Sequence, residues 1–221
     1  MPDPNAAPIP WENLSKAPQP MTQVGMVVDL RRCTGCHACS VACKTEHHVP
    51  LGGFRIRTRY FEKPHAPTLS FLPILCMHCR DAPCIEACPN DAMVREKDGR
   101  VVVDKESCLA DGACIKACPY GAIYIDPQEQ VADKCDFCRD RTQVGLDPAC
   151  VSACPTDTLK FVDLHGAEGL PEGAPEAAAL REKEGTRPAV LYVHHQPWME
   201  EHLHTGVQLS KDDTDVIYEQ K

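Results

Sequence analysis

The apolar residues of this chain gather in short runs that are separated by cysteine, glycine and proline. Such runs occupy residues 25–30, 101–103, 122–125, 159–162 and 189–193. Their length and the turn residues around them predict short β-strands. Short helices are expected directly after cysteine-containing loops, at 113–117 and 151–153. The pattern predicts a repeated strand–loop–helix unit and an α+β fold with short strands, short helices and long loops.

Polar and proline-rich segments flank this core. Residues 1–23 contain six prolines and are predicted to form an extended N-terminal arm, either disordered or wrapped on a partner. Residues 164–188 are rich in Gly, Pro, Ala and Glu and are predicted to be a linker with one short exposed helix at 176–184. Residues 189–221 are expected to form one strand followed by an acidic, partner-binding tail.

The cysteine content indicates how so small a core is held together. Fifteen of the 221 residues are cysteine, whereas 5% are aromatic. A small chain with few large hydrophobic side chains has difficulty in building a sufficient core, so we expect a covalent or metallic cross-link. Disulfides fit poorly, because the number of cysteines is odd and many of them lie three positions apart.

The charge and the hydropathy exclude two classes of interaction. The formal net charge is −9, whereas phosphate binding needs clustered Lys and Arg, so we expect no nucleic acid. No apolar run approaches the length of a membrane-spanning helix, so we expect no direct membrane span. Residues 1–21 lack the apolar stretch of a signal peptide, and Arg31-Arg32 precedes Cys33 instead of the apolar segment of a twin-arginine signal.

The cysteines fall into four groups along the chain. The first is Cys33, Cys36, Cys39 and Cys43; the second is Cys76, Cys79, Cys84 and Cys88; the third is Cys108, Cys114 and Cys118, with Asp111 among them; the fourth is Cys135, Cys138, Cys150 and Cys154. A proline follows the last cysteine of the second, third and fourth groups. The compact spacing C-x2-C-x2-C-x3-C is typical of bacterial ferredoxins that bind cubane clusters.

This spacing suits iron–sulfur chemistry for a physical reason. Cysteines separated by two residues in a loop can converge on one cluster while backbone N–H groups point at its sulfur atoms. The cysteine after three further residues faces away and binds the other cluster of a pair. Zinc is the alternative for a lone pair such as Cys76 and Cys79, but it does not account for three repeats of C-x3-C-P. His78, inside that loop, is expected beside the cluster and not as a ligand.

With these motifs and the segments 29–36 and 42–46, the chain resembles the electron-transfer subunits of the complex iron–sulfur molybdoenzymes. It is similar to the four-cluster subunits of polysulfide, thiosulfate, tetrathionate and dimethyl sulfoxide reductases over residues 24–163, and again over 185–192. The resemblance implies a double ferredoxin-like core made of two interleaved halves. Residues 24–75 and 120–163 would form one half from the first and fourth groups, and residues 76–119 the other.

The resemblance also implies four ligand sets. They are Cys33, Cys36, Cys39 and Cys154 for cluster 1; Cys43, Cys135, Cys138 and Cys150 for cluster 2; Cys76, Cys79, Cys84 and Cys118 for cluster 3; and Cys88, Cys108 and Cys114 for cluster 4, with position 111 as its remaining ligand place.

The chain departs from the family pattern at Asp111, where a cysteine is expected. Cluster 4 is then either a [3Fe–4S] cluster, which we favour because relatives of the nitrate reductase type hold one, or a [4Fe–4S] cluster with a carboxylate as a harder ligand. A [3Fe–4S] cluster typically has the higher potential and would be a good acceptor from quinol. The expected cofactors are therefore three [4Fe–4S] clusters and one [3Fe–4S] or Asp-ligated [4Fe–4S] cluster.

The resemblance implies an electron-transfer subunit without catalytic residues of its own. Cluster 1 would face a catalytic subunit with molybdopterin and molybdenum or tungsten, which reduces or oxidises a sulfur compound or a related substrate. Cluster 4 would face an integral-membrane subunit that binds quinone. The chain would be peripheral to the membrane, at the cytoplasmic face or, after co-export with a partner bearing a twin-arginine signal, at the periplasmic face. The alternatives are a free-standing polyferredoxin and a structural zinc module.

Overall fold

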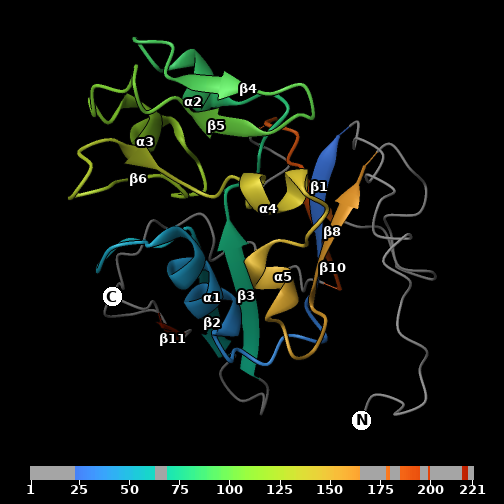
Figure 1. The fold of residues 1–221 in the computed structure, drawn as a ribbon. Helices are drawn as coiled ribbons and strands as arrows, with labels where there is room; N and C mark the ends of the chain where they lie inside the picture. The colour runs from blue at the N-terminus through green and yellow to red at the C-terminus, as the bar shows by residue number, and fades with distance from the viewer. Residues whose placement is uncertain are drawn as a thin grey trace.

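Short strands, short helices and long loops alternate along the chain (Figure 1). The computed structural model describes residues 23–62, 69–164, 178–179, 185–194, 199 and 216–218. The strands are β1 (Val24–Asp29), β2 (Ile56–Glu62), β3 (Leu69–Leu75), β4 (Met93–Arg95), β5 (Val101–Val103), β6 (Tyr124–Ile125), β7 (Ala132–Asp133), β8 (Leu159–Asp163), β9 (Ala178–Ala179), β10 (Val190–Val193) and β11 (Val216–Tyr218). The helices are α1 (Ala38–His47), α2 (Pro83–Glu86), α3 (Ala113–Ala117), α4 (Arg139–Gln143) and α5 (Ala149–Ser152).

Strand β1 lies inside a sheet that brings distant parts of the chain together. It pairs antiparallel with β8 and parallel with β10, and β9 pairs with the far side of β10. Met26 and Val28 of β1 have no solvent exposure, and neither have Val190 and Tyr192 of β10. A strand that is covered on both faces reads as an unbroken apolar run, which explains why the sequence pattern reveals β1.

A second sheet contains the hairpin of β2 and β3, with β11 paired to the other edge of β2. The sequence pattern does not reveal these strands, because β2 contains Arg57 and Arg59 and β3 contains Pro73, residues that are uncommon in buried strands. Arg59 is nonetheless buried. Tyr192 of β10 donates a hydrogen bond to the Pro73 carbonyl at 2.7 Å and so joins the two sheets.

The helices pack in pairs. Helix α1 packs against α5, and α2 packs against α3. In Figure 1, α2 and α3 lie in the upper part of the molecule with the ribbon β4–β5, whereas α1 and α5 lie in the lower part with β2 and β3. Helices α1 and α5 contain cysteines of the first and fourth groups, and α2 and α3 contain cysteines of the second and third. Within the described ranges, no helix is both long and apolar enough to cross a membrane.

The structure confirms the mixed α and β character and most of the predicted elements. Strands β1, β5, β8 and β10 and helix α3 lie where the sequence pattern predicts them. The strand expected at 122–125 is reduced to β6, and the helix expected at 151–153 begins earlier, directly after Pro148, which occupies its N-cap position. The prediction of a helix at 176–184 is wrong for Ala178 and Ala179. These two residues form strand β9, which pairs with the edge of β10. The other residues of that helix, residues 1–22 of the arm and most of the acidic tail lie outside the described residues.

We expect the hydrogen bond of Tyr192 to stabilise the contact between the sheets. The substitution Tyr192→Phe leaves the buried Pro73 carbonyl without this donor, which costs about 1 to 3 kcal/mol. The midpoint of thermal unfolding, followed by circular dichroism, should therefore fall. Leu51→Ala, at a side chain that is 96% exposed, is the control and should leave the midpoint where it is. An unchanged midpoint for Tyr192→Phe would contradict this role of the hydroxyl.

Candidate iron–sulfur centres

All fifteen cysteines lie in described parts of the structure, and none of them forms a disulfide. Short helices and tight turns position them. Cys39 and Cys43 project from α1, Cys84 from α2, Cys114 from α3 and Cys150 from α5. The loops before α1, α2, α3 and α4 contain residues in the left-handed conformation, namely Gly35, His37, His78, Ala110, Gly112, Phe137 and Cys138. Such residues reverse the chain sharply and turn successive N–H groups toward one place, as in an anion-binding nest.

The first gathering of thiols combines cysteines of the first group with the last cysteine of the fourth group. Cys33, Cys36, Cys39 and Cys154 line one hollow, together with Thr156 and Thr158. Burial and the neighbouring Cys39 and Cys154 sulfurs raise the pKa of Cys33 to about 11, although the Gly35 backbone opposes the shift. Burial also acts on Cys154, but hydrogen bonds from Thr156 and Thr158 outweigh it and lower the pKa of this thiol.

The second gathering consists of Cys43, Cys135, Cys138 and Cys150, all of which are buried. Burial and the charge of Cys138 raise the pKa of Cys43 to about 12. Burial and the charges of neighbouring thiolates likewise place the pKa values of Cys135 and Cys150 well above their usual range. Four thiolates in this place repel one another, and a cation among them would offset that repulsion.

The third gathering consists of Cys76, Cys79, Cys84 and Cys118. Burial and the neighbouring sulfur of Cys76 raise the pKa of both Cys79 and Cys84 to about 12. Lys134 lowers the pKa of Cys84, and its ammonium group is buried, where it donates to the carbonyl oxygens of Val101 and Cys135. Lys134 therefore offsets part of the negative charge of these thiolates.

The fourth gathering contains three thiols and one carboxylate. Cys88, Cys108, Asp111 and Cys114 line one hollow. Burial, Cys108 and Asp111 raise the pKa of Cys114. The carboxylate of Asp111 is exposed and accepts hydrogen bonds from the Ala113 backbone N–H at 2.7 Å and from the Asn90 side chain at 3.1 Å.

These four gatherings fit iron–sulfur clusters. The thiolate is the form that binds a metal, and burial of several thiolates together disfavours that form unless a cation compensates it. Backbone amides also point at the sulfur atoms, as they do around anionic clusters. These N–H···S contacts are His78 to Cys76, Ala92 to Cys88, Ala132 to Cys108, Phe137 to Cys135, Ala149 to Cys138 and Thr158 to Cys154, at 3.3 to 3.5 Å.

Two aromatic rings connect the second and third gatherings. His78 and Phe137 occupy corresponding places in the loops between Cys76 and Cys79 and between Cys135 and Cys138. Both rings are 1% exposed, and they stack with their centroids 3.9 Å apart. The His78 Nδ1 accepts the Val101 N–H at 3.1 Å, and burial, aided by Lys134, lowers the His78 pKa well below its usual value. His78 is therefore a neutral packing residue beside the thiols, as its place in the loop predicts.

A buried ionic network lies beside the second gathering. The Arg55 guanidinium binds both oxygens of Asp133, at 2.7 and 2.9 Å, and lies 3.3 Å from an oxygen of Asp136. Tyr124 donates to Asp133, and His47 lies 3.1 Å from the Cys138 sulfur. No motif connects Arg55, Asp133 and His47 to the cysteines, so the sequence alone does not reveal their place beside these thiols. The position of Asp136 inside the Cys135–Cys138 loop was the one available signal.

The thiol gatherings define the chain as an iron–sulfur protein, and comparisons with known proteins agree. The sequence profile of the 4Fe-4S dicluster domain matches residues 67–164. The chain is 41% identical over 151 residues to the thiosulfate reductase electron transfer subunit PhsB of Salmonella typhi, an alignment that covers 66% of this chain and 79% of the relative.

Two further relatives carry names of the same type. A tetrathionate reductase subunit of Salmonella typhimurium is 36% identical over 183 residues, which are 79% of this chain and 73% of the relative. A subunit of the polysulfide reductase of Wolinella succinogenes is 38% identical over 177 residues, which are 76% and 93%. The chain belongs to this family of iron–sulfur electron-transfer subunits, as its cysteine pattern predicts.

The network around Arg55 yields a test of stability. Arg55→Leu leaves the carboxylates of Asp133 and Asp136 without their cation in a buried place, which costs about 3 to 5 kcal/mol. We expect a lower unfolding temperature and loss of bound iron, measured by calorimetry and by iron analysis. Arg57→Leu, which removes a guanidinium bonded to the Gly121 carbonyl at the surface, is the matched control.

A second variant separates the loss of charge pairing from a general effect of the substitution. Asp133→Asn in the Arg55→Leu background removes one of the unpaired charges and should recover part of the unfolding temperature. If Arg55→Leu unfolds at the same temperature as Arg57→Leu, the ionic network does not stabilise this site.

Proposed function

We propose that this chain relays electrons through four iron–sulfur clusters between a molybdopterin-containing catalytic subunit and an integral-membrane, quinone-binding subunit. Its work would be to hold the clusters in place, to set their potentials and to exclude water from most of them. The observation that carries the proposal is the gathering of fifteen thiols and one carboxylate into four sets of four ligand groups, the number that a cubane cluster takes. Bound clusters supply one-electron transfer, at potentials that the surrounding charge, hydrogen bonds and burial set.

We assign the ligands as the family pattern implies. Electrostatic coupling among the thiols supports each set: Cys33 with Cys36, Cys39 and Cys154; Cys135 with Cys43 and Cys150, and Cys138 with Cys43; Cys84 with Cys76, Cys79 and Cys118; and Cys114 with Cys88, Cys108 and Asp111. In this assignment the last cysteine of each group contributes to a different cluster from its neighbours.

The assignment divides the core into two interleaved halves. Residues 24–75 and 120–163 would form one half and residues 76–119 the other, with 1–23 as an arm, 164–188 as a linker and 189–221 as a strand and a partner-binding tail. The packing of α1 on α5 and of α2 on α3 supports this division. Strand β10 pairs with β1, which supports the assignment of a strand of the core to the C-terminal segment.

Asp111 favours a [3Fe–4S] cluster in the fourth set, beside three [4Fe–4S] clusters. Both of its carboxylate oxygens already accept hydrogen bonds, from Ala113 and from Asn90. Such a carboxylate caps the turn before α3, and three thiols suffice for a cluster that lacks one iron. A cluster of this kind at the quinone-facing end would favour the acceptance of electrons from quinol.

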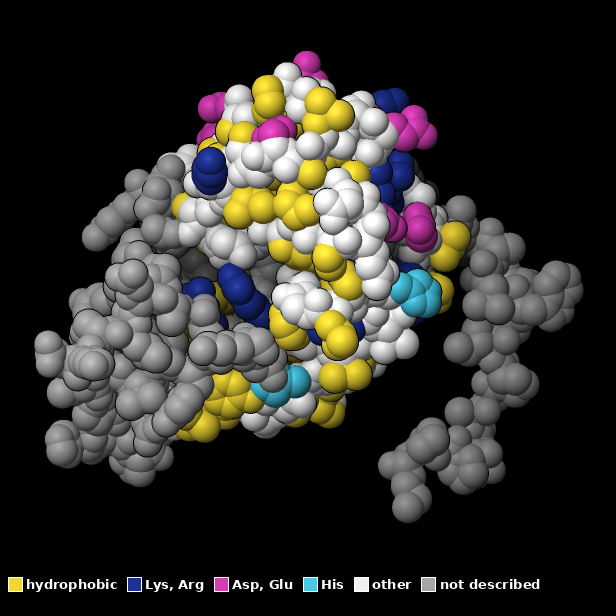
Figure 2. Space-filling model, turned by 90° about the vertical axis from the view of Figure 1, so that its left-hand side faces the viewer, with side chains coloured by type: hydrophobic (Ala, Val, Ile, Leu, Met, Phe, Trp, Pro, Cys, Tyr) yellow, Lys and Arg dark blue, Asp and Glu magenta, His cyan; other side chains and the backbone are white. Residues whose placement is uncertain are grey.

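The surface of the chain supports the assignment of partners. On the face shown in Figure 2, hydrophobic side chains lie in several groups with charged side chains between and around them. Large apolar side chains are exposed beside the thiols: Leu109 is 72% exposed next to Cys108, and Val41 is 63% exposed between Cys39 and Cys43. Exposed apolar groups of this kind mark interaction sites when they cluster. We place the chain at the membrane periphery through its partners, on the cytoplasmic or the periplasmic side.

Purification separates this proposal from its alternatives. The chain should copurify with a large molybdenum or tungsten subunit, be brown and contain about fifteen iron atoms if three clusters are cubanes and one has three irons. A brown protein that is monomeric in its native extract would indicate a free-standing polyferredoxin. A colourless protein that contains zinc would overturn the proposal.

The type of the fourth cluster can be tested at Asp111. The oxidised holoprotein should give the EPR signal of a [3Fe–4S] cluster, and Asp111→Cys should remove it and add about one iron per chain. Asp111→Asn keeps the size of the side chain and serves as the control that retains the three-iron signal. Sixteen irons and no [3Fe–4S] signal in the unaltered protein would show instead that Asp111 is a ligand.

The interleaved assignment makes a distinct prediction for three cysteines. Cys39→Ala and Cys154→Ala should perturb the same cluster signal in a reductive EPR titration, although 115 positions separate them in sequence, and Cys43→Ala should perturb a different one. If Cys39→Ala and Cys43→Ala affect one signal and Cys154→Ala another, each cysteine group binds its own cluster and the halves are not interleaved.

A further inference from the structure

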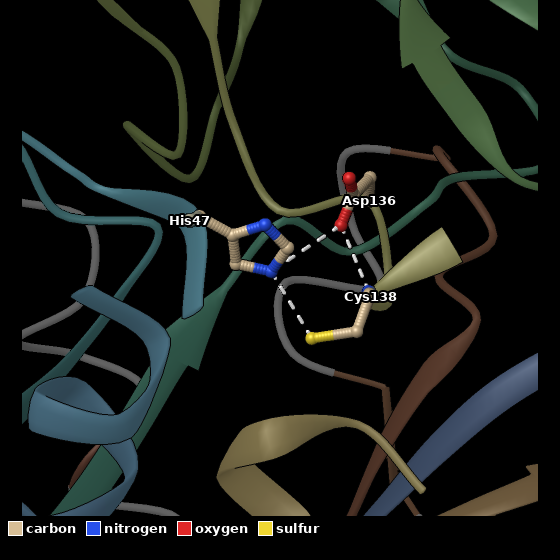
Figure 3. Close-up of side chains that lie close together, drawn as sticks. All are labelled: His47, Asp136 and Cys138. Carbon is tan, nitrogen blue, oxygen red and sulfur yellow. Dashed lines mark hydrogen bonds and ion pairs between the residues drawn. The ribbon is translucent and has the colours of Figure 1, made fainter. Parts of the chain in front are cut away.

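Side chains outside the cysteine motifs also contact cysteine sulfurs: Thr58 lies 3.9 Å from Cys39, and a histidine lies at a shorter distance from another sulfur. His47, the last residue of α1, places its Nε2 atom 3.1 Å from the sulfur of Cys138, which caps the start of α4. The two residues are 91 positions apart in the sequence. Figure 3 shows the imidazole, the Cys138 thiol and the Asp136 carboxylate turned toward one another.

We propose that His47 is a positioning residue that donates a hydrogen bond to the Cys138 thiolate and thereby raises the reduction potential of the cluster held by Cys43, Cys135, Cys138 and Cys150. This inference rests on the proposed ligand assignment. It adds to that assignment a residue that acts on one cluster through one sulfur.

The direction of the hydrogen bond follows from the chemistry of the sulfur. A thiolate that binds iron has no proton, so it can only accept, and the ring must hold its proton on Nε2. Asp136 does not compete for this proton at close range, because its Oδ1 atom lies 3.9 Å from Nε2 and accepts the Cys138 N–H at 2.8 Å.

The surroundings of the imidazole hold it in this direction. The Asp136 carboxylate is fixed at its other oxygen by Arg55, at 3.3 Å, and Arg55 is itself held by both oxygens of Asp133. His47 is partly buried, with 16% of its side chain exposed. The ring therefore lies between a fixed carboxylate and the sulfur, with little freedom to turn away.

The Cys138 sulfur accepts a side-chain hydrogen bond in addition to a backbone one, unlike several of the other cysteine sulfurs. Cys76, Cys88, Cys108 and Cys135 each accept a backbone N–H. Cys138 accepts the Ala149 N–H at 3.4 Å and the imidazole in addition. Hydrogen bonds to cluster sulfurs stabilise negative charge and so favour the reduced, more negative state. The second cluster should therefore be easier to reduce than it would be without His47.

The same three side chains could also chelate a separate metal ion, since their ligand atoms lie within 4.8 Å of one another. Two features disfavour that alternative. The assignment gives the Cys138 thiolate to a cluster, and the Arg55 guanidinium already binds Asp136. A second cation would have to approach this guanidinium, which like charge disfavours.

The test compares variants of the chain in its purified complex, with all clusters loaded. His47→Leu removes the donor, His47→Gln retains an amide N–H at a similar reach, and His48→Asn is the control at an exposed neighbour in the left-handed conformation. Iron is counted per chain, and the potential of each cluster is measured by EPR-monitored redox titration. Deuterium exchange with pulsed EPR of the second cluster reports whether an exchangeable proton is bonded to its sulfur.

We expect full iron in all three variants and a lower potential of a single cluster in His47→Leu. The shift should correspond to about a tenfold change in the one-electron equilibrium, or 59 mV, together with loss of one deuterium coupling. His47→Gln should restore most of the potential and the coupling, and His48→Asn should change neither.

The outcomes separate this inference from the proposed function. Full iron with an unchanged potential and an unchanged deuterium coupling in His47→Leu would overturn the role of His47 and leave the four-cluster relay intact. Loss of iron in both His47→Leu and His47→Gln would overturn it too, because His47 would then be required for cluster assembly. A complex in which the unaltered chain lacks four clusters would refute the ligand assignment itself.

Discussion

The structure depends on the need to hold many thiolates together out of water. Burial, together with the charge of neighbouring sulfurs, raises the pKa of Cys33, Cys43, Cys79 and Cys84 to about 11 or 12. The chain has few aromatic residues, and cysteines make up a large part of its buried core. Iron would supply the compensating charge, so cluster binding and folding are expected to be linked.

The protein holds the thiols in place through strand pairing and hydrogen bonds between distant parts of the chain, and its helices and strands are short. Strand β1 pairs with β8 and β10, which come from much later in the sequence. The segment before β10 adds a second connection: the Ala189 N–H donates to the Met77 carbonyl, and the Arg80 and Asp81 N–H groups donate to the carbonyls of Arg187 and Thr186. The C-terminal segment therefore binds both β1 and the loop of the second cysteine group, and fixes these two regions relative to each other.

The four thiol gatherings differ in their electrostatic surroundings, which bears on an electron relay. Cys36 of the first set is exposed, whereas all four thiols of the second are buried beside Arg55, Asp133 and Asp136. The third lies near the buried Lys134, and the fourth has a carboxylate in place of a thiol. Because potential depends on burial, charge and hydrogen bonds, the four proposed clusters would differ in potential even where their ligands are the same.

The sequence by itself determined the chemistry of this protein, because ligand spacing is a local property. Cysteines two or three residues apart are held close by the chain, so the motifs indicate the clusters and the family before any folding is considered. The apolar runs of β1 and β10 were also recognisable in the sequence, since most of their residues are apolar and buried, and β8 was recognisable from Leu159, Phe161 and Val162. The tertiary structure alone decided which other strands pair and which side chains surround the thiols. The ion pairs of Arg55 and the contact of His47 with Cys138 join residues far apart in sequence, so no local motif indicates them. Strands β2 and β3 are neighbours in sequence, but their arginines and Pro73 conceal the apolar pattern of a buried hairpin.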